Sequence, residues 1–305
     1  MMRPSGSWVA MITPFGKDNK IDYSAFETLI ERQIKYNTSE LFLLGSAGET
    51  TLLSVEEKKE LIKKTLAIAK GKIPVFYSCA SNTTEGSVEL ARYCEAEGAD
   101  GVVFTVPPYV LLSQEAAFVH MDTCMSSIKI PCGIYNNPTR LGVNMNPETI
   151  AQLSEKHDHF IADKEAMPDV SQLVQVKRLC GDRVNILCCD MPKYSIVIPT
   201  LAVGGNGTAN IGGNIIPEEV ARFSRPWESV EIMNECREGY FKWYPLLDIL
   251  YKLSNPIVIK AALNILGLPG GPMRKPYLDF SGPYYDVLKT MMNEMGVVEK
   301  YGVKW

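Results

Sequence analysis

A lysine at the end of a short apolar run is the residue of this sequence best suited to covalent chemistry. Lys164 closes the run Phe160–Lys164, in which strand alternation would point its side chain into the interior of a barrel. A buried amine is costly unless it is paired or uncharged. Because an uncharged amine attacks carbonyl carbons, Lys164 is a candidate nucleophile that forms a Schiff base with a ketone. The alternative is a strand-end lysine whose amine extends to water.

A phenol and a hydroxyl lie at predicted positions from which they could exchange protons with that amine. Tyr135 ends another apolar run and precedes a proline-bearing turn, so its hydroxyl could move protons during imine formation. Ser46 lies in the glycine-flanked turn Gly45–Glu49 and could pass a proton to Tyr135. The alternatives are a core tyrosine bonded to the backbone and an ordinary turn serine.

Two groups could bind a carboxylate. The backbone N–H groups of Ser46 and Ala47 point into one turn and could hold an anion there. Arg140 could bind a carboxylate through two parallel hydrogen bonds, although a surface salt bridge is the alternative. With Lys164, these groups describe a site for an acid that also carries a ketone.

The elements that must position these residues alternate between short apolar runs and longer amphipathic segments. Strand followed by helix, repeated about eight times with short connections, predicts parallel βα units. The predicted strands are Trp8–Thr13, Glu40–Leu44, Ile73–Cys79, Gly101–Val106, Pro131–Tyr135, Phe160–Lys164, Val184–Cys189 and Gly207–Ile211. The predicted helices are Asp22–Ile34, Ser54–Lys70, Thr84–Glu97, Gln114–Ser127, Pro147–Lys156, Val170–Leu179 and Lys193–Val203.

The closure of these units decides the fold class. An open, doubly wound sheet that binds a dinucleotide should carry G-x-G-x-x-G after an early strand, and Gly45-Ser-Ala-Gly48 does not match. Even units favour an α/β fold of the TIM-barrel type, a (β/α)₈ barrel. In such a barrel the ends of the strands carry the chemistry, which is where the candidate residues fall. We expect residues 1–222 to form the barrel and residues 223–305 a helical region packed on it. The helices of that region are predicted at Pro226–Leu253, Pro256–Leu266 and Pro283–Met295.

Three motifs together resemble a known family. Gly45-Ser-Ala-Gly-Glu49, Tyr135-Asn-Asn-Pro-Thr-Arg140 and Lys164-Glu-Ala166 occur in the order and spacing of the dihydrodipicolinate synthase / N-acetylneuraminate lyase family. Thr13-Pro14 and the tail segment Ser254–Lys260 also look like that family. The resemblance spans nearly the whole chain and implies a class I, Schiff-base aldolase on a (β/α)₈ barrel.

The resemblance also implies roles for particular residues. Lys164 would form the imine with pyruvate or another 2-keto acid, and Tyr135 would be the general acid and base. Ser46 would be the relay hydroxyl, while the amides of Ser46 and Ala47 would hold the carboxylate of the keto acid. Arg140 would bind the carboxylate of a second substrate. We further expect three residues to line the substrate site: Gly45, Tyr109 and Ala209.

Several positions depart from the pattern of the family. Ala47 stands where a hydroxyl residue is usual, and Val110 stands where the synthases carry the second of two tyrosines. Cys188-Cys189-Asp190 replaces a small, polar run. These changes leave the second substrate open. The alternatives to a synthase-like lyase are a dehydratase or aldolase of a 3-deoxy-2-keto sugar acid, and a catalytically impaired barrel that binds a keto acid.

Composition excludes other classes of function. A net charge of −4 over 305 residues argues against nucleic-acid or membrane partners. Eight cysteines are scattered without a C-x-x-C pair, and His120, His157 and His159 avoid the strand ends, so we expect no metal site. We expect no cofactor beyond the covalent imine. The absence of a signal-peptide pattern or a long apolar run predicts a cytoplasmic protein. By resemblance, it would be a homotetramer or homodimer.

Overall fold

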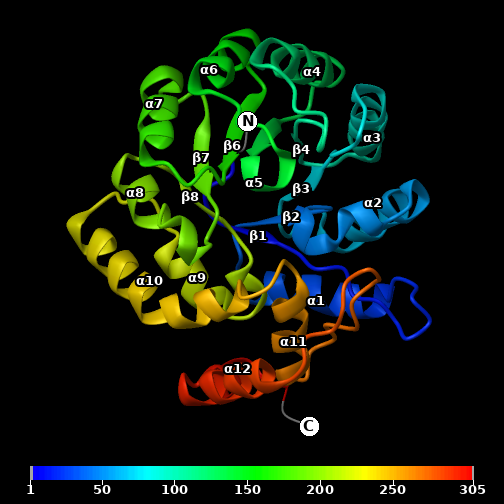
Figure 1. Cartoon of the computed structure of the whole chain (residues 1–305), viewed down its shortest axis with the longest axis vertical. Coiled ribbons are helices and arrows are strands. Elements are labelled where there is room, and N and C mark those ends of the chain that lie inside the picture. Colours follow the sequence, from blue (N-terminus) through cyan, green and yellow to red (C-terminus); the bar gives the residue numbers. More distant parts are fainter. Residues whose placement is uncertain (1–2, 304–305) are drawn as a thin grey trace.

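The computed structural model describes residues 3–303 and has eight parallel strands that close into a barrel. The strands follow one another around the barrel in chain order, and β8 pairs with β1 to complete it (Figure 1). The α/β fold class and the (β/α)₈ barrel predicted from the sequence are therefore confirmed. The strands are β1 Gly6–Ala10, β2 Glu40–Leu43, β3 Val75–Ser78, β4 Gly101–Phe104, β5 Cys132–Asn136, β6 Phe160–Glu165, β7 Asn185–Cys188 and β8 Gly207–Asn210.

Helices surround the barrel and continue beyond it. Within the barrel they are α1 Tyr23–Lys35, α2 Val55–Ala69, α3 Thr84–Glu97, α4 Gln114–Ser126, α5 Pro138–Leu141, α6 Pro147–Lys156, α7 Val170–Cys180, α8 Val197–Ala202 and α9 Pro217–Phe223. Short 3-10 turns are η1 Ser46–Gly48, η2 Thr50–Leu52, η3 Pro192–Tyr194 and η4 Gly212–Asn214. The C-terminal helices are α10 Val230–Leu250, α11 Ile257–Ile265, α12 Pro283–Glu294 and α13 Val297–Tyr301.

Helix boundaries follow local capping chemistry. Ser54 caps α2 and forms with Glu57 the reciprocal capping box that the sequence predicts. The single helix predicted over Lys193–Val203 is wrong, because Ser195 adopts a left-handed conformation with φ of 53° and separates η3 from α8. The sequence patterns also missed α5, α9 and α13.

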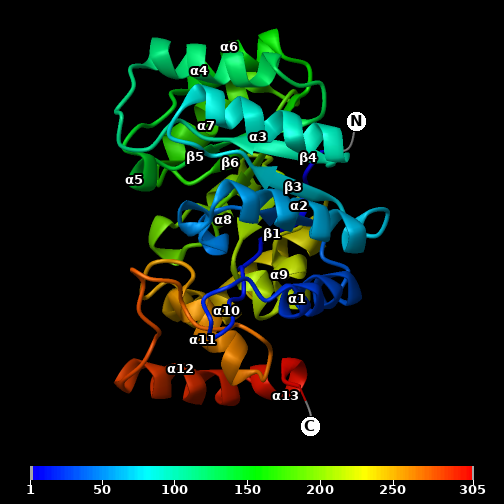
Figure 2. The same ribbon diagram turned by 90° about the vertical axis from the view of Figure 1, so that its right-hand side faces the viewer.

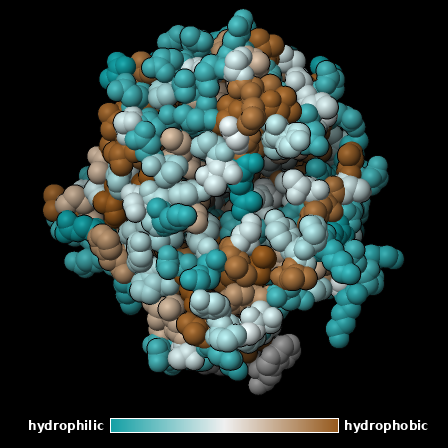
Figure 3. Space-filling model, viewed as in Figure 1, coloured by the Kyte–Doolittle hydropathy of each residue, from teal (hydrophilic) through white to brown (hydrophobic). Residues whose placement is uncertain are grey.

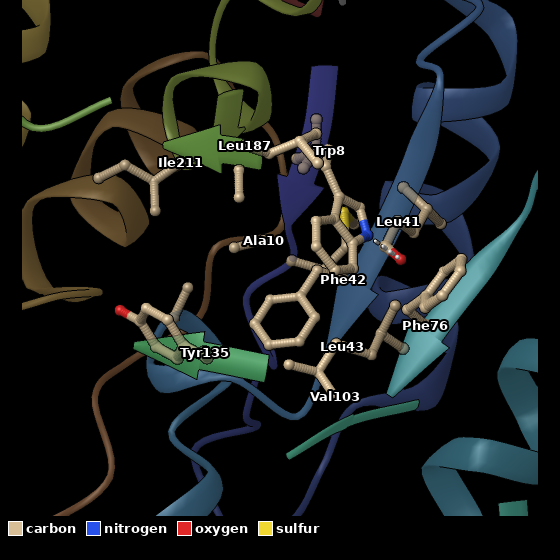
Figure 4. Packing of buried hydrophobic residues seen from close by; sticks show 14 of the residues in the cluster. Trp8, Ala10, Leu41, Phe42, Leu43, Phe76, Val103, Tyr135, Leu187 and Ile211 are labelled. Carbon is tan, nitrogen blue, oxygen red and sulfur yellow. Dashed lines mark hydrogen bonds between the residues drawn. The ribbon is translucent and has the colours of Figure 1, made fainter. Parts of the chain in front are cut away.

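Large side chains fill the interior of the barrel. Trp8 stands between Phe42 and Phe76, with ring centroids 5.3 Å from each, and its indole N–H donates to the Leu41 carbonyl (Figure 4). Tyr135 faces the same interior from β5, with its ring 6.4 Å from that of Phe42. The barrel interior is thus a packed core.

The barrel closes where two glycines lie opposite each other. Gly6 of β1 is the Cα partner of Gly207 of β8, and Gly207 has φ of 144°. A Cβ added to Gly207 would meet the carbonyl oxygen of Gly6 at 2.1 Å. Only glycine fits this close approach of the two backbones, so the closure of the sheet depends on it.

The C-terminal helices lie against the β8–β1 side of the barrel. α10 packs along α9, and α12 lies outside α10 and α11 (Figure 1). The segment between α11 and α12 returns toward the barrel and runs beside the segment before α1. It lies on the same side of the molecule as α5, which follows β5 (Figure 2). That side carries the carboxyl ends of the strands.

Two carboxyl groups lie on the outer face of β6, behind Lys164. Asp163 and Glu165 are both fully buried between the sheet and the helices. Glu165 accepts hydrogen bonds from Asn136 and Gln172, whereas neither carboxyl oxygen of Asp163 meets a donor among residues 3–303. Burial raises the pKa of both groups, that of Glu165 to about 7 and that of Asp163 well above its usual range, where the charge of Glu165 adds to the effect.

Because of this buried pair, we expect the free energy of unfolding to fall as the pH rises. The folded state binds more protons than the unfolded chain above about pH 4, where unfolded carboxyls ionise. The stabilisation is therefore complete at low pH and lost as the pH rises through about 7, the folded-state pKa of Glu165. We expect Asp163→Asn to remove much of this loss and to raise the free energy of unfolding at pH 8 by about 1–3 kcal/mol. Urea unfolding at pH 5 and pH 8 measures it.

Asp158, an exposed residue just before β6, provides a control. Asp158→Asn should leave the pH dependence as in the wild type. If the free energy of unfolding of Asp163→Asn changed between pH 5 and pH 8 as much as that of the wild type, the buried pair would not be the source of the pH dependence.

Candidate active site

Lys164 lies inside the barrel with almost no exposed surface. Its side chain is 4% exposed, and Nζ lies 4.2 Å from the centroid of the Tyr135 ring and 5.6 Å from that of Phe42. Nζ donates one hydrogen bond, to the carbonyl oxygen of Ala209 at 3.2 Å. Among residues 3–303 no carboxylate oxygen lies within 4 Å of it. The inward direction predicted from strand alternation is confirmed, and the amine is held without an ion-pair partner.

A second buried lysine shows what a structural lysine looks like in this protein. Lys260 of α11 is 1% exposed, and its Nζ lies 2.5 Å from the carboxylate of Glu49 and donates to the carbonyl of Pro272. Burial lowers the pKa of Lys260, and the charge of Glu49 opposes that shift. A paired ammonium cannot act as a nucleophile. The difference between the two environments singles out Lys164.

Tyr135 stands directly beside Lys164 in the sheet. The two residues are Cα partners on β5 and β6, and Tyr135 is 9% exposed. Its hydroxyl accepts a hydrogen bond from Asn137 Nδ2 at 2.7 Å. The side-chain oxygen Oδ1 of Asn137 caps α5 by accepting a hydrogen bond from the backbone N–H of Arg140. Asn137 therefore fixes the phenol, a contact that the sequence patterns missed although Asn137 belongs to the same motif.

The loop after β2 brings Ser46 to the barrel mouth. It consists of the two 3-10 turns η1 and η2, joined at Glu49, which has φ of 55°. Gly45 and Ser46 line a cavity of about 160 Å³ together with Tyr135 and Arg140. Ala47 is buried next to this cavity and does not line it. The structure thus brings together four of the predicted site residues.

A second cavity adjoins the first across Tyr135 and Arg140. It measures about 520 Å³ and reaches from the end of β5 to the loops after β7 and α10. Cys189, Tyr194 and Tyr251 line it. Lys164 lines neither cavity, whereas Tyr135, its partner in the sheet, lines both, so the two cavities meet at the residue beside the amine.

The end of β7 carries a buried acid close to Lys164. Asp190 accepts hydrogen bonds from the N–H groups of Ile211 and Gly212 and from the hydroxyl of Tyr251. Burial raises the pKa of this carboxyl, and the positive charge of Lys164 is among the effects that lower it. Asp190 thereby ties the loop after β7 to the loop after β8 and to the end of α10, which shapes the second cavity.

The other predicted site residues lie at different depths. Ala209 is in the interior and contributes the carbonyl that Lys164 contacts. Tyr109 is 97% exposed in the loop between β4 and α4, and the structure does not bring it to either cavity of its own chain. Its neighbours Val110 and Leu111 are also exposed. Figure 3 shows apolar residues gathered on the face between α4 and α5.

Residues 3–303 contain no group of three or more His, Cys, Asp or Glu side chains placed to hold a metal ion. None of the helices described is both long and apolar enough to cross a membrane.

A closed βα barrel that holds an unpaired lysine beside a tyrosine defines a class of enzyme, the aldolase-type lyases of class I. The comparison with known families gives the particular one. The chain belongs to the dihydrodipicolinate synthetase family, whose sequence model matches residues 3–295.

The relatives support this placement over nearly their full lengths. A 4-hydroxy-tetrahydrodipicolinate synthase of Clostridium perfringens is 32% identical over 294 residues, which cover 96% of this chain and 99% of the relative. One of Methanocaldococcus jannaschii is 32% identical over 302 residues, with the same coverage of both chains. The solved structure of a 4-hydroxy-tetrahydrodipicolinate synthase from Methylacidiphilum fumariolicum superposes with a TM-score of 0.91 at 30% identity, covering 99% of this chain and 100% of that one.

Proposed function

We propose that this lyase condenses or cleaves 2-keto acids through an imine between Lys164 Nζ and the keto carbon of pyruvate. The observation that carries the proposal is the buried amine of Lys164, which has one carbonyl acceptor and, among residues 3–303, no ion-pair partner. An amine held at this position can attack the carbonyl carbon of a ketone. No cofactor enters, since the protonated imine itself accepts the electron pair released at the neighbouring carbon.

The surrounding groups suit the steps of this reaction. The phenol of Tyr135 lies beside the amine and can move protons between the nitrogen, the carbinolamine oxygen and the substrate. The turn at Ser46 offers backbone N–H groups for the carboxylate of the keto acid. Arg140 faces both cavities and offers a guanidinium for a second carboxylate. The relatives named above are 4-hydroxy-tetrahydrodipicolinate synthases, which supports pyruvate as the first substrate.

Reductive trapping tests the proposal directly. Protein incubated with pyruvate and borohydride should gain the mass of one reduced pyruvate adduct, and peptide mass spectrometry should place it on Lys164. Borohydride without pyruvate, and pyruvate without borohydride, are the controls. Wild-type protein that stays unmodified at saturating pyruvate would overturn the proposal.

Removal of one phenol oxygen should slow the reaction and leave the imine possible. In Tyr135→Phe the ring that packs on Lys164 and Phe42 remains, and only the hydroxyl held by Asn137 is lost. We expect turnover to fall by about 10²–10⁴-fold, the usual contribution of a general acid and base. Trapping should still occur at Lys164, at a lower rate. Stopped assays of keto-acid consumption and timed trapping measure the two effects, and Tyr284→Phe on the exposed start of α12 is the matched control.

We also propose that the chain assembles with further copies, as a tetramer or dimer, in the cytoplasm. The exposed side chains Tyr109, Val110 and Leu111, at 97%, 55% and 67%, support a covered surface in the assembly. Eight buried, unbridged cysteines support a reducing compartment. Size-exclusion chromatography with light scattering measures the mass of the assembly. Leu111→Asp should shift that mass toward the mass of the monomer.

A further inference from the structure

The side chains of the proposed imine chemistry lie on two neighbouring strands whose pairing is irregular. Near the start of these strands, Cys132 of β5 pairs with Phe160 of β6. The next residue of β5, Gly133, pairs with Ala162, so the pairing passes over one residue of β6, as at a β-bulge. Because side chains alternate between the two faces of a strand, a further shift of one residue above this point would turn Lys164 away from the barrel interior.

A hydrogen-bonded pair on the outer face joins the two strands above this bulge. Tyr135 and Lys164 are Cα partners and point inward. The next Cα partners along the strands are Asn136 and Glu165, which alternation turns to the outer face. There Asn136 Nδ2 donates to both carboxyl oxygens of Glu165 at 3.1 Å, and neither residue is more than 1% exposed. The contact thus spans the strands one residue beyond the phenol and the amine.

Further hydrogen bonds hold the amide of Asn136 in one orientation. Its oxygen Oδ1 accepts from the backbone N–H of Met145 at 3.0 Å, and Nδ2 also donates to Oδ1 of Asn144 at 2.8 Å. Glu165 accepts in addition from Nε2 of Gln172 on α7. Because a buried polar network whose members are all bonded is rigid and favours one arrangement, these contacts are suited to fixing how β5 and β6 are paired.

The same short segment also holds the phenol. Asn136 lies between Tyr135 and Asn137, and Nδ2 of Asn137 donates to the hydroxyl of Tyr135 at 2.7 Å. A displacement of Asn136 would therefore move both the phenol and the residue that orients it. Proton transfer depends steeply on the positions of the reacting groups, and a misplacement of about 1 Å can cost about 10²-fold in rate.

We propose that Asn136 and Glu165 are positioning residues, whose contact sets the register that places the phenol of Tyr135 beside the amine of Lys164. The inference rests on the proposed function, in which Tyr135 moves protons while the imine forms on Lys164. Asn136 and Glu165 lie behind the sheet and line neither cavity at the barrel mouth. Their effect on the reaction must therefore pass through the phenol, which a purely structural role would not require.

A double-mutant cycle with Tyr135→Phe tests the inference. The measured quantity is the rate at which borohydride traps pyruvate on Lys164. Asn136→Asp keeps the size of the side chain and replaces its donor by an oxygen that faces Glu165. With Tyr135 present, this change should slow trapping by about 10–10²-fold. In Tyr135→Phe it should slow trapping by less than about twofold, because the hydroxyl that it would misplace is already absent.

Asn185→Asp on β7 is the matched control, since its amide also donates across the barrel wall, to the carbonyl of Pro4 before β1. It should be trapped at the wild-type rate. Asn136→Ala introduces no charge and replaces Asn136→Asp in the cycle if that variant does not fold.

Equal slowing of trapping in the two backgrounds would overturn the inference, because it would show a structural effect that does not pass through the phenol. Trapping of Asn136→Asp at the wild-type rate would overturn it as well. Failure of the proposed function looks different, since the wild type would then not be trapped by pyruvate at all.

Discussion

Lys164→Met should abolish imine formation and leave the fold intact. The variant keeps the length of the side chain and removes only the amine. Because Lys164 lies against the rings of Tyr135 and Phe42 and gives a single hydrogen bond, an apolar side chain suits its position. We expect turnover to fall by about 10⁴-fold or more, as when a covalent nucleophile is lost. The melting temperature should stay equal or rise. Keto-acid consumption, borohydride trapping and thermal unfolding measure the three effects.

The control for this experiment is Lys193→Ala, which removes an exposed lysine just after β7. It should be trapped and turn over as the wild type does. Trapping in Lys164→Met at the wild-type level, with the adduct on another lysine, would move the nucleophile elsewhere. A large loss of stability would instead show that the amine has a structural role.

The inward direction of Lys164 could be predicted because period-2 alternation is a local property. A strand gives its residues to two faces, so the inward direction of Lys164 follows from its own five-residue run. The same holds for Tyr135, its partner on the neighbouring strand. Because parallel strands all end at one face of a barrel, the sequence order of motifs was enough to bring them together.

Contacts between distant segments could not be predicted in this way. Tyr277, from the segment between α11 and α12, lines the cavity that Ser46 and Tyr135 also line. Arg274 of the same segment binds Glu57, 217 residues away in sequence, and no pattern in the tail signals that pair. Alternation places Asp163 and Glu165 on the same outer face of β6, but it does not show that the helices bury both carboxyl groups there. Tyr109 stays a prediction, since its place after β4 predicts proximity to the site while the loop of the single chain leaves it 97% exposed.

The ion pair between Lys260 and Glu49 should carry a large share of the stability of this fold. Lys260→Met leaves the carboxylate of Glu49 buried, at 2% exposure, with the backbone N–H of Arg274 as its remaining donor. Breaking a buried pair by removing one partner costs about 3–5 kcal/mol, because the other charge stays uncompensated. Burial already raises the pKa of Glu49, and the loss of Lys260 removes the main charge that opposes this shift. Urea unfolding measures the loss.

The double variant Glu49→Gln/Lys260→Met distinguishes the loss of the ion pair from a loss of packing. Removing both charges should restore most of the stability, since no uncompensated charge remains and the glutamine oxygen can still accept from Arg274. A single-variant loss below about 1 kcal/mol, or losses that simply add in the double variant, would contradict this account.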